Sequence, residues 1–188
     1  MVCATAVSVG FMLPDTLGIL NPLQVIEFMR ENEEALSRPS ILIFMRTMTM
    51  NLAVSNVLAA VLSGVKGLHT TINGLGERAG NAPLASVQAI LKDHFHAITR
   101  IDESRLNDVS RVVESYSGVT IPANKPIVGE SVFTQVAGVH ADGDNKNKLY
   151  FNDLLPERFG RVREYALGKK FRESQHPQES GEYGTGTG

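Results

Sequence analysis

The chain has 188 residues, of which 43% are hydrophobic and 20% charged, a composition typical of a folded chain rather than a disordered one. A formal net charge of -2 argues against a protein that binds nucleic acid mainly through phosphate contacts. The single cysteine, Cys3, excludes an intrachain disulfide framework and favours a reducing, cytoplasmic compartment. Residues 1–12 are apolar but lack a basic leading region and are too short to span a bilayer, so we expect no membrane partner.

Strand-like and helix-like segments alternate through the first half of the chain. Residues 11–18 predict a buried strand that ends in a polar turn. The sequence Asn21-Pro22-Leu23-Gln24 predicts a helix start, with a cap, a first-turn proline and a Gln at the third position. That helix should cover about residues 22–33, and its buried side should carry Leu23, Ile26, Phe28 and Met29.

The next two units follow the same pattern. The apolar content of residues 40–50 predicts a strand, and a helix that stops near Gly64 should follow, marked by Leu52, Ser55, Leu58 and Leu62. Residues 66–73 then suit a strand, followed by a Gly-rich turn and a helix capped by Asn81 and carrying Leu84, Val87, Leu91 and Phe95. Strands that alternate with helices predict parallel βαβ units with right-handed crossovers.

The pattern changes after His96. Asp102 is expected to cap a helix that ends at Gly118 and carries Leu106, Val109, Val113 and Tyr116 on one face. A loop with two prolines, a turn at 155–160 and a short strand at 164–169 should follow. We therefore divide the chain into a first domain at 1–97, a second, helical subdomain at 98–169, and a disordered tail at 170–188.

Four motifs occur in one order along the chain: LPDTLG at 13–18, NGLGERAGN at 73–81, VGESVFTQVAGVHADGD at 128–144 and LPERFGRVREYALGK at 155–169. Together they resemble the 2-isopropylmalate, (R)-citramalate and homocitrate synthase family, from about Phe11 to Lys169; residues 1–10 do not match. The resemblance implies an α/β fold, namely the last three βα units of a (β/α)8 TIM barrel followed by a small, mainly helical subdomain. The run from His140 to Arg161 is most similar to citramalate-synthase-type members.

The resemblance also implies an activity and its site residues. Family members are acyltransferases that join acetyl-CoA to a 2-oxo acid, 2-oxoisovalerate or pyruvate, in branched-chain amino-acid biosynthesis, and they act as homodimers with a divalent metal (Mg, Mn or Zn). Asn81 matches a metal ligand, Thr16 a contact to the substrate carboxylate, and His140 a group that assists proton transfer. Asp142 and Tyr150 match its substrate-side neighbours, although Lys148 departs from the usual Asn.

Each of these residues also has a purely structural interpretation. Asn81 suits a helix cap, Thr16 a turn, and His140 a polar surface loop. His69 is expected to be a packed strand residue, and two other histidines, His94 and His96, should lie on an exposed helix end. An exposed ion pair, of little energetic consequence, is expected between Glu77 and Arg78.

One family motif, HxHND, is missing from the second strand segment. The alignment puts its histidines at positions 45 and 47, where the chain has Met45 and Thr47, side chains that do not replace imidazole as ligands for these metals. A back-translation of residues 41–51 read in another frame restores HxHND, and the same operation on the tail restores a family-like sequence. We hypothesise that residues 39–50 and 170–188 are out-of-frame readings, which the sequence of the encoding DNA would test.

Three functional interpretations remain open. The first is the family condensation, with an inactive chain expected because the first five barrel units and both histidines are not in this sequence. The second is homocitrate synthase, or a related metal-dependent aldolase or lyase of the same barrel family. The third is a non-catalytic fragment that only associates with an intact subunit.

Overall fold

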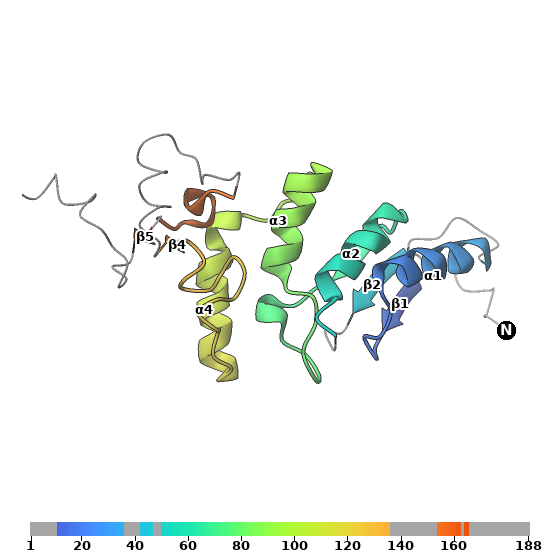
Figure 1. Ribbon diagram of the computed structural model, residues 1–188, viewed down its shortest axis with the longest axis horizontal. Helices are drawn as coiled ribbons and strands as arrows, with labels where there is room; N and C mark the ends of the chain where they lie inside the picture. The colour runs from blue at the N-terminus through green and yellow to red at the C-terminus, as the bar shows by residue number, and fades with distance from the viewer. Residues whose placement is uncertain (1–10, 36–41, 47–49, 136–153, 163, 166–188) are drawn as a thin grey trace, which may run out of the picture. The chain divides into compact units, whose positions relative to one another are not determined.

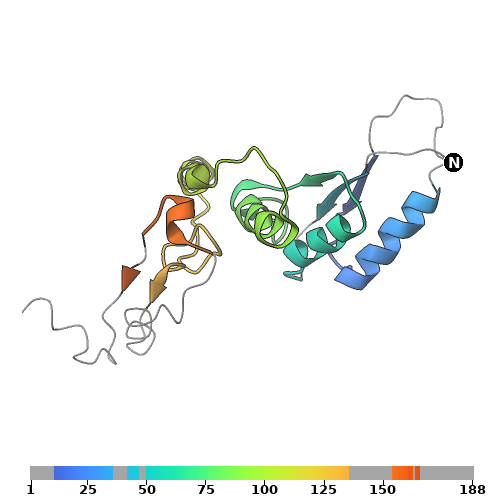
Figure 2. The same cartoon turned by 90° about the horizontal axis from the view of Figure 1, so that it is seen from above.

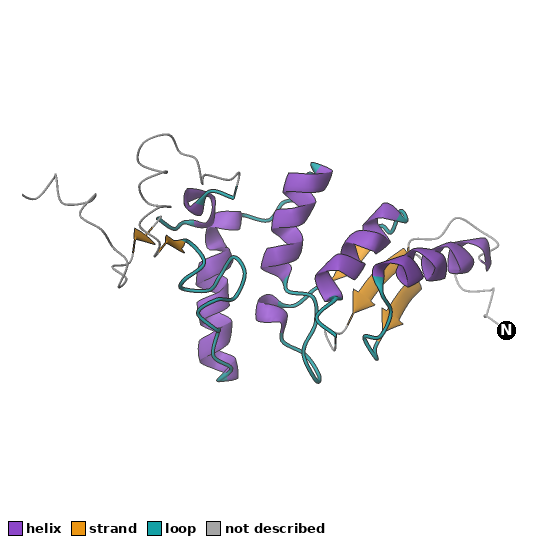
Figure 3. Cartoon of the chain, viewed as in Figure 1, coloured by secondary structure: helices purple, strands orange, loops and turns teal. Residues whose placement is uncertain are grey.

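A computed structural model describes residues 11–35, 42–46, 50–135, 154–162 and 164–165 of the protein (Figures 1 and 3). The chain separates into two compact units. The first comprises Met1–Ile101 with Asp108–Thr120, and the second comprises Asp102–Asn107 with Ile121–Gly188. None of the described helices is long and apolar enough to cross a membrane.

A three-stranded parallel sheet forms the framework of the first unit. Its strands are β1 (Phe11–Asp15), β2 (Leu42–Arg46) and β3 (Gly67–His69), in the order β1-β2-β3. The connecting helices, α1 (Pro22–Ala35) and α2 (Ala53–Leu62), lie on one face of the sheet in both views (Figures 1 and 2). The predicted parallel βαβ arrangement is therefore confirmed.

The start of α1 follows the predicted capping pattern. The Asn21 side chain accepts a hydrogen bond from the Gln24 backbone N–H at 3.0 Å, and the Gln24 side chain accepts one from the Asn21 N–H at 2.9 Å. This reciprocal pair satisfies two backbone donors that a helix start leaves without partners. Pro22 occupies the first helical position, where its missing N–H has no cost.

The buried face of α1 agrees only in part with the predicted one, since Met29 is buried as expected and Phe28 is half-buried. Val25 and Met29, at i and i+4, are buried in α1, whereas Leu23 is 77% exposed and Ile26 40% exposed. In α2 the small residues Ala53, Val57 and Ala60 are fully buried, while Leu62 is 70% exposed. Ala53, Val57 and Ala60 form one core cluster with Val25 and Met29 of α1, so the two helices pack against each other through these residues.

The third strand–helix (βα) unit of the sheet is shorter and more irregular than predicted. β3 ends at His69, and a 3-10 turn (Ile72–Gly74) replaces the rest of the expected strand, because Asn73 adopts a left-handed conformation with φ 57°. α3 begins at Leu84 with Pro83 at its N-cap, and it ends at Phe95. The prediction that Asn81 caps this helix is wrong: Thr71 pairs with the 82–84 segment, so residues 81–83 stay extended.

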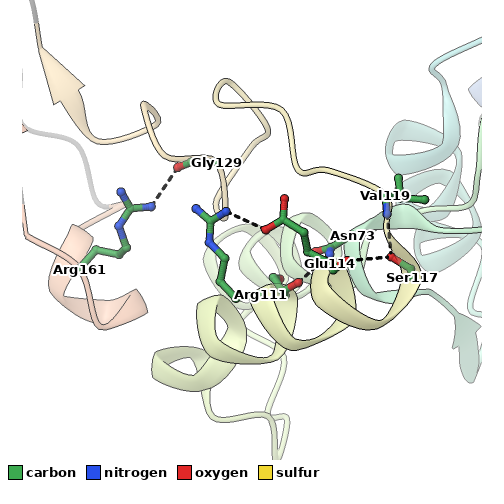
Figure 4. A network of polar contacts seen from close by, with 8 residues as sticks. Asn73, Arg111, Glu114, Ser117, Val119, Gly129 and Arg161 are labelled. Atoms are coloured by element: carbon green, nitrogen blue, oxygen red, sulfur yellow. Dashed lines mark hydrogen bonds and ion pairs between the residues drawn. The ribbon is translucent and has the colours of Figure 1, made fainter.

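The second unit has a small aromatic and ionic core. Phe133 stacks on Phe159, with ring centroids 5.9 Å apart, and Phe159 belongs to a 3-10 turn (Pro156–Phe159) that Gly160 ends in a left-handed conformation. Arg161 donates to the Gly129 carbonyl at 2.9 Å (Figure 4) and to the Glu130 carbonyl at 2.8 Å. Two short strands, β4 (Thr134–Gln135) and β5 (Glu164–Tyr165), pair in parallel.

α4 (Leu106–Ser117) is the helix predicted after His96, and its ends agree with the prediction. Asp102 accepts a hydrogen bond from the Ser104 N–H just before it, in a 3-10 turn (Glu103–Arg105), and Gly118 ends it with φ 68°. Contacts assign Asp108–Thr120 to the first unit, whereas the sequence placed the whole helix in the second domain. Independent folding of the predicted domains, 1–97 and 98–169, stays a prediction.

Candidate functional site

The candidate site lies where the parallel strands end at their carboxyl side, since loops at this edge carry the functional groups of α/β folds. Strand register brings the relevant positions to one level. Asp15, the last residue of β1, is paired with Arg46, the last residue of β2, and Met45 lies between Pro14 and His69. The loop that follows β1 carries Thr16, and the loop that follows β3 carries Asn81.

The loop after β1 is organised by Asp15. Its side chain is buried, and its two carboxylate oxygens accept hydrogen bonds from the Gly18 N–H at 2.9 Å and the Leu20 N–H at 3.3 Å. Gly18 has φ 69°, which allows the chain to turn back over the carboxylate. Thr16, in the middle of this turn, is exposed to solvent. Asp15 is not among the predicted site residues, although Asp and Gly are both residues that favour turns.

The loop after β3 is closed on itself by backbone contacts. The Asn81 N–H donates to the Gly74 carbonyl at 2.8 Å, and the Gly80 N–H donates to the Glu77 carbonyl at 2.9 Å. A Cβ atom at Gly80 would overlap the Gly74 carbonyl oxygen, and one at Gly76 would lie 2.5 Å from Asn81 Nδ2. Gly80 is therefore required by close packing of the backbone inside the loop, whereas a side chain at Gly76 would have to displace the Asn81 amide.

The Arg78 side chain connects the two loops. The Arg78 guanidinium donates a hydrogen bond from Nη2 to the Thr16 carbonyl oxygen, and its Nη1 lies 3.6 Å from Glu77 Oε2. The side chains of Arg78 and Glu77 are 44% and 89% exposed, which confirms the predicted exposed ion pair. The link to Thr16 was not predicted, because contacts between residues 62 positions apart leave no local pattern in a sequence.

The β3 loop is also connected to α4. Asn73, labelled in Figure 4, donates a hydrogen bond from Nδ2 to the Ser110 carbonyl at 2.9 Å. Ser110 is itself buried. The left-handed conformation of Asn73 therefore coincides with a side-chain contact that holds it. Figure 4 also shows Arg111 paired with Glu114 on the same helix, at 3.0 Å.

The donor groups near this edge do not fit a divalent metal. Asn81 offers a single amide, whose nitrogen lies 3.5 Å from the Leu75 carbonyl, and position 45 in β2 carries a thioether. Within the described ranges, no three His, Cys, Asp or Glu residues are grouped so that they could hold a metal ion. We therefore derive no chemical step through a metal.

The remaining predicted residues divide into two groups. The prediction that His69 is packed is wrong, since its side chain is exposed on β3, whereas His94 and His96 are exposed at the end of α3 as predicted. Four other predicted positions lie outside the described residues, namely Thr47, His140, Asp142 and Tyr150. The same is true of residues 170–188, one of the two segments predicted to be out of frame; the other segment is described only in β2 and at residue 50.

The family model described as HMGL-like matches residues 2–113. The chain belongs to the HMGL-like family. The match begins at residue 2, so it also includes residues 2–10, which the motif-based resemblance left out. This membership supports the α/β barrel-type architecture inferred from the strand–helix alternation.

Curated relatives of this HMGL-like chain carry three different synthase names. A homocitrate synthase of Sulfolobus acidocaldarius is 40% identical over 157 residues, which are 84% of this chain and 33% of the relative. A protein assigned as an (R)-citramalate synthase in Methanopyrus kandleri is 37% identical over 155 residues, 82% of this chain and 30% of the relative. A 2-isopropylmalate synthase of Sulfurisphaera tokodaii is 34% identical over 169 residues, 88% of this chain and 44% of the relative. The chain thus spans less than half of each.

Solved structures of HMG-CoA lyases have a fold similar to that of this chain. An HMG-CoA lyase from Acinetobacter baumannii, in complex with coenzyme A and 3-methylmalate, is 27% identical with a TM-score of 0.54, over 61% of this chain and 39% of that one. Hydroxymethylglutaryl-CoA lyase from Pseudomonas aeruginosa has a TM-score of 0.55 at 20% identity, over 60% and 39% of the two chains, and supports the fold alone.

Proposed function

We propose that this HMGL-like chain is the last three βα units of a (β/α)8 barrel with its following subdomain, from a synthase that condenses acetyl-CoA with a 2-oxo acid. The observation that carries the proposal is the meeting of two family motifs at one sheet edge: Thr16 of LPDTLG and the loop of NGLGERAGN are joined by Arg78. The names of the three synthase relatives support the reaction class.

In this proposal the chain's own residues bind and orient the acid. The Thr16 hydroxyl, exposed beside the Arg78 guanidinium, donates a hydrogen bond to the substrate carboxylate, and Asp15 keeps the turn that presents it. Condensation then requires removal of a methyl proton from acetyl-CoA, attack of the resulting carbanion on the keto carbon, and hydrolysis of the thioester. His140 is proposed to assist proton transfer, with Asp142 and Tyr150 beside it, across a homodimer in the cytoplasm.

We propose further that the isolated chain does not turn over. Activation of the keto group in this family is expected from a divalent metal, and Met45 occupies one of the two positions where the alignment expects histidine. Thr47 occupies the other. Preorganised catalysis needs its complete set of groups, so loss of the activating centre should remove most of the rate even where substrate contacts persist.

Release of free CoA thiol from acetyl-CoA tests this proposal. The purified chain should release no thiol above the no-enzyme rate with pyruvate, 2-oxoisovalerate or 2-oxoglutarate, with Mg²⁺ or Mn²⁺ present. The same assay on the homologous intact synthase serves as the positive control. Turnover by the chain alone would overturn the inactive-fragment proposal, and the acid that supports it would distinguish the synthase types, homocitrate synthase included.

A specific observation favours the second candidate, a non-catalytic chain that associates with an intact family member. Within the described part of the fold, β1 and β3 are the two edges of the sheet, and apolar side chains remain exposed on β1 (Met12) and on α1 (Leu23 and Ile26). A cavity of about 330 Å³ beside β3 and α3 is lined by Leu68, Leu84 and Leu91 among others. The occupant that fits is further barrel chain, because the relatives are more than twice as long as the matched region.

Association is measured by mixing the chain with an intact synthase relative and analysing the mixture by sedimentation. We expect a complex that Leu84→Asp, in the cavity wall, weakens, while Val119→Asp, at an exposed position outside the cavity, does not. Unchanged sedimentation of both components would exclude this candidate, and a complex of the chain with itself would replace it by self-association.

A further inference from the structure

Arg78 holds an uncommon backbone conformation next to the proposed site. Its φ of 54° lies in the left-handed region, where a residue with a Cβ atom carries a conformational cost. Glycine would remove that cost, and the same loop uses glycine at positions 76 and 80. A long cationic side chain at such a position points to a contact that offsets the cost.

The contact is the one to Thr16. Arg78 Nη2 donates to the Thr16 carbonyl, which lies inside the turn that Asp15 organises through the Gly18 and Leu20 amides. On the other side, the backbone around Arg78 is fixed by the hydrogen bonds from Gly80 to Glu77 and from Asn81 to Gly74. One guanidinium therefore connects two loops that are each ordered by their own contacts, so a movement of either loop is transmitted to the other.

We propose that Arg78 is a positioning residue, which ties the loop carrying Thr16 to the loop carrying Asn81 so that both face one substrate. This inference rests on the proposed function for the identity of that substrate, a 2-oxo acid. Arg78 is not a catalytic residue in this scheme, since it binds the protein backbone. Its planar guanidinium can donate one hydrogen bond to the Thr16 carbonyl and still point its other N–H groups at further acceptors. A lysine ammonium does this less well, because its donors do not form a fixed planar fork.

Hydrogen exchange of the whole chain tests the contact without requiring any activity. Arg78→Ala should speed exchange of the amides of residues 17–20 by about fivefold, which corresponds to the loss of one partly exposed, charge-assisted hydrogen bond. Arg78→Lys should recover part of this protection. Glu77→Ala, which removes only the exposed neighbour, is the matched control and should leave residues 17–20 unchanged.

Two outcomes would overturn the proposal. The first is exchange of residues 17–20 that is the same in Arg78→Ala as in the unaltered chain. The second is an equal acceleration of exchange in α3, which would indicate general destabilisation. Arg78→Gly distinguishes general destabilisation from a local effect, because it relieves the backbone cost and should accelerate exchange only at residues 17–20.

The positioning role is then tested by titrating pyruvate and 2-oxoisovalerate against the Thr16 methyl resonance. Arg78→Ala should weaken both affinities by the same factor, about fivefold, and Arg78→Lys should restore part of it. If the unaltered chain binds neither acid, the proposed function fails while the exchange result still decides the loop contact. Equal affinities in all variants, with exchange changed, would overturn the positioning role.

Discussion

Arg158 donates two hydrogen bonds to Glu103, from Nε at 2.6 Å and from Nη2 at 2.7 Å, across 55 positions of the sequence. The Glu103 side chain is buried, at 4% exposed, and that of Arg158 is largely covered, at 16% exposed, so this is a bidentate ion pair mostly shielded from solvent. The Arg158 guanidinium also lies 5.2 Å from the centre of the Phe159 ring. The pair joins the segment before α4 to the 3-10 turn at 156–159, two distant parts of the second unit.

Removal of one partner of this pair should be strongly destabilising. Glu103→Gln is expected to lower the free energy of unfolding by about 2–4 kcal/mol, because the buried guanidinium loses its counter-charge. The measurement is urea unfolding followed by circular dichroism, with the exposed neighbour Glu157→Gln as control. The double variant Glu103→Leu with Arg158→Met should regain much of the loss. A Glu103→Gln variant as stable as the control would show that the pair is not needed.

The glycines of the β3 loop allow a second prediction with a matched control. Gly80 and Gly64 have almost the same φ, 89° and 86°, but a Cβ at Gly80 overlaps the Gly74 carbonyl while one at Gly64 meets nothing within 4 Å. Both Gly→Ala variants should lose about 1 kcal/mol to the left-handed backbone. Gly80→Ala should lose about 2 kcal/mol more, because the loop must also shift.

The difference between the two unfolding free energies is the informative quantity. Stability alone cannot show that the loop moved, so the Asn81 amide resonance should also be compared, since its N–H donates to the same Gly74 carbonyl. We expect it to move in Gly80→Ala and to stay in place in Gly64→Ala. Equal losses in both variants, with an unmoved Asn81 amide, would contradict the packing argument for Gly80.

Patterns of residues that are close in the sequence predicted the local structure well. Side-chain contacts between residues far apart in the sequence were not predicted. The Asn21–Gln24 capping box, the Asp102 cap and the Gly118 helix end depend on residues within a few positions, and the structure confirms all three. The parallel direction of the strands could be expected from the alternation of strands and helices, since parallel strands need crossover connections.

Among the predictions that the structure contradicts, those for Asn81 and Leu23 involve a competing contact elsewhere in the fold. Asn81 has cap chemistry, but Thr71 pairs with the segment after it and keeps that segment extended. Leu23 is predicted on the buried side of α1 but is exposed, whereas Val25 of the same helix lies in the hydrophobic core with residues of α2. The candidate site shows the same division: Thr16 and Asn81 came from motifs, whereas Arg78 joins them through a contact that only the fold creates.

Asp102 gives a pH-dependent prediction with a definite sign. Hydrogen bonds from the Ser104 hydroxyl at 2.6 Å and the Ser104 N–H at 3.1 Å, in that order of effect, hold the pKa of the Asp102 carboxyl below its ordinary value. Because the folded pKa is the lower one, the stabilisation is complete above the ordinary Asp pKa and disappears as the pH falls through the folded value. Stability should therefore fall on acidification.

An NMR titration of the Asp102 carboxyl measures this directly. Ser104→Ala removes the hydroxyl donor and should move the pKa of Asp102 upward, toward its ordinary value, while the N–H bond preserves part of the shift. Asp102→Asn keeps an oxygen that can cap the turn but has no titration, so its unfolding free energy should lose this component of pH dependence. An unchanged Asp102 pKa in Ser104→Ala would contradict the assignment of the cause.

The final prediction concerns the metal site that the described residues do not form. Met45 lies in β2 between Pro14 and His69, and positions 45 and 47 are two apart, the spacing that places side chains on one face of an extended chain. The double variant Met45→His with Thr47→His should therefore present two imidazoles at the edge that carries Asn81. We expect Zn²⁺ or Mn²⁺ affinity at least about tenfold above that of the unaltered chain, measured by calorimetry.

A second pair, Phe44→His with Arg46→His, has the same spacing and composition but belongs to the opposite face of the strand, so it should gain less. Equal affinities of the two histidine pairs, or no gain in either, would show that the alignment of HxHND with positions 45 and 47 is wrong, and would remove the reason for invoking a shifted reading frame there.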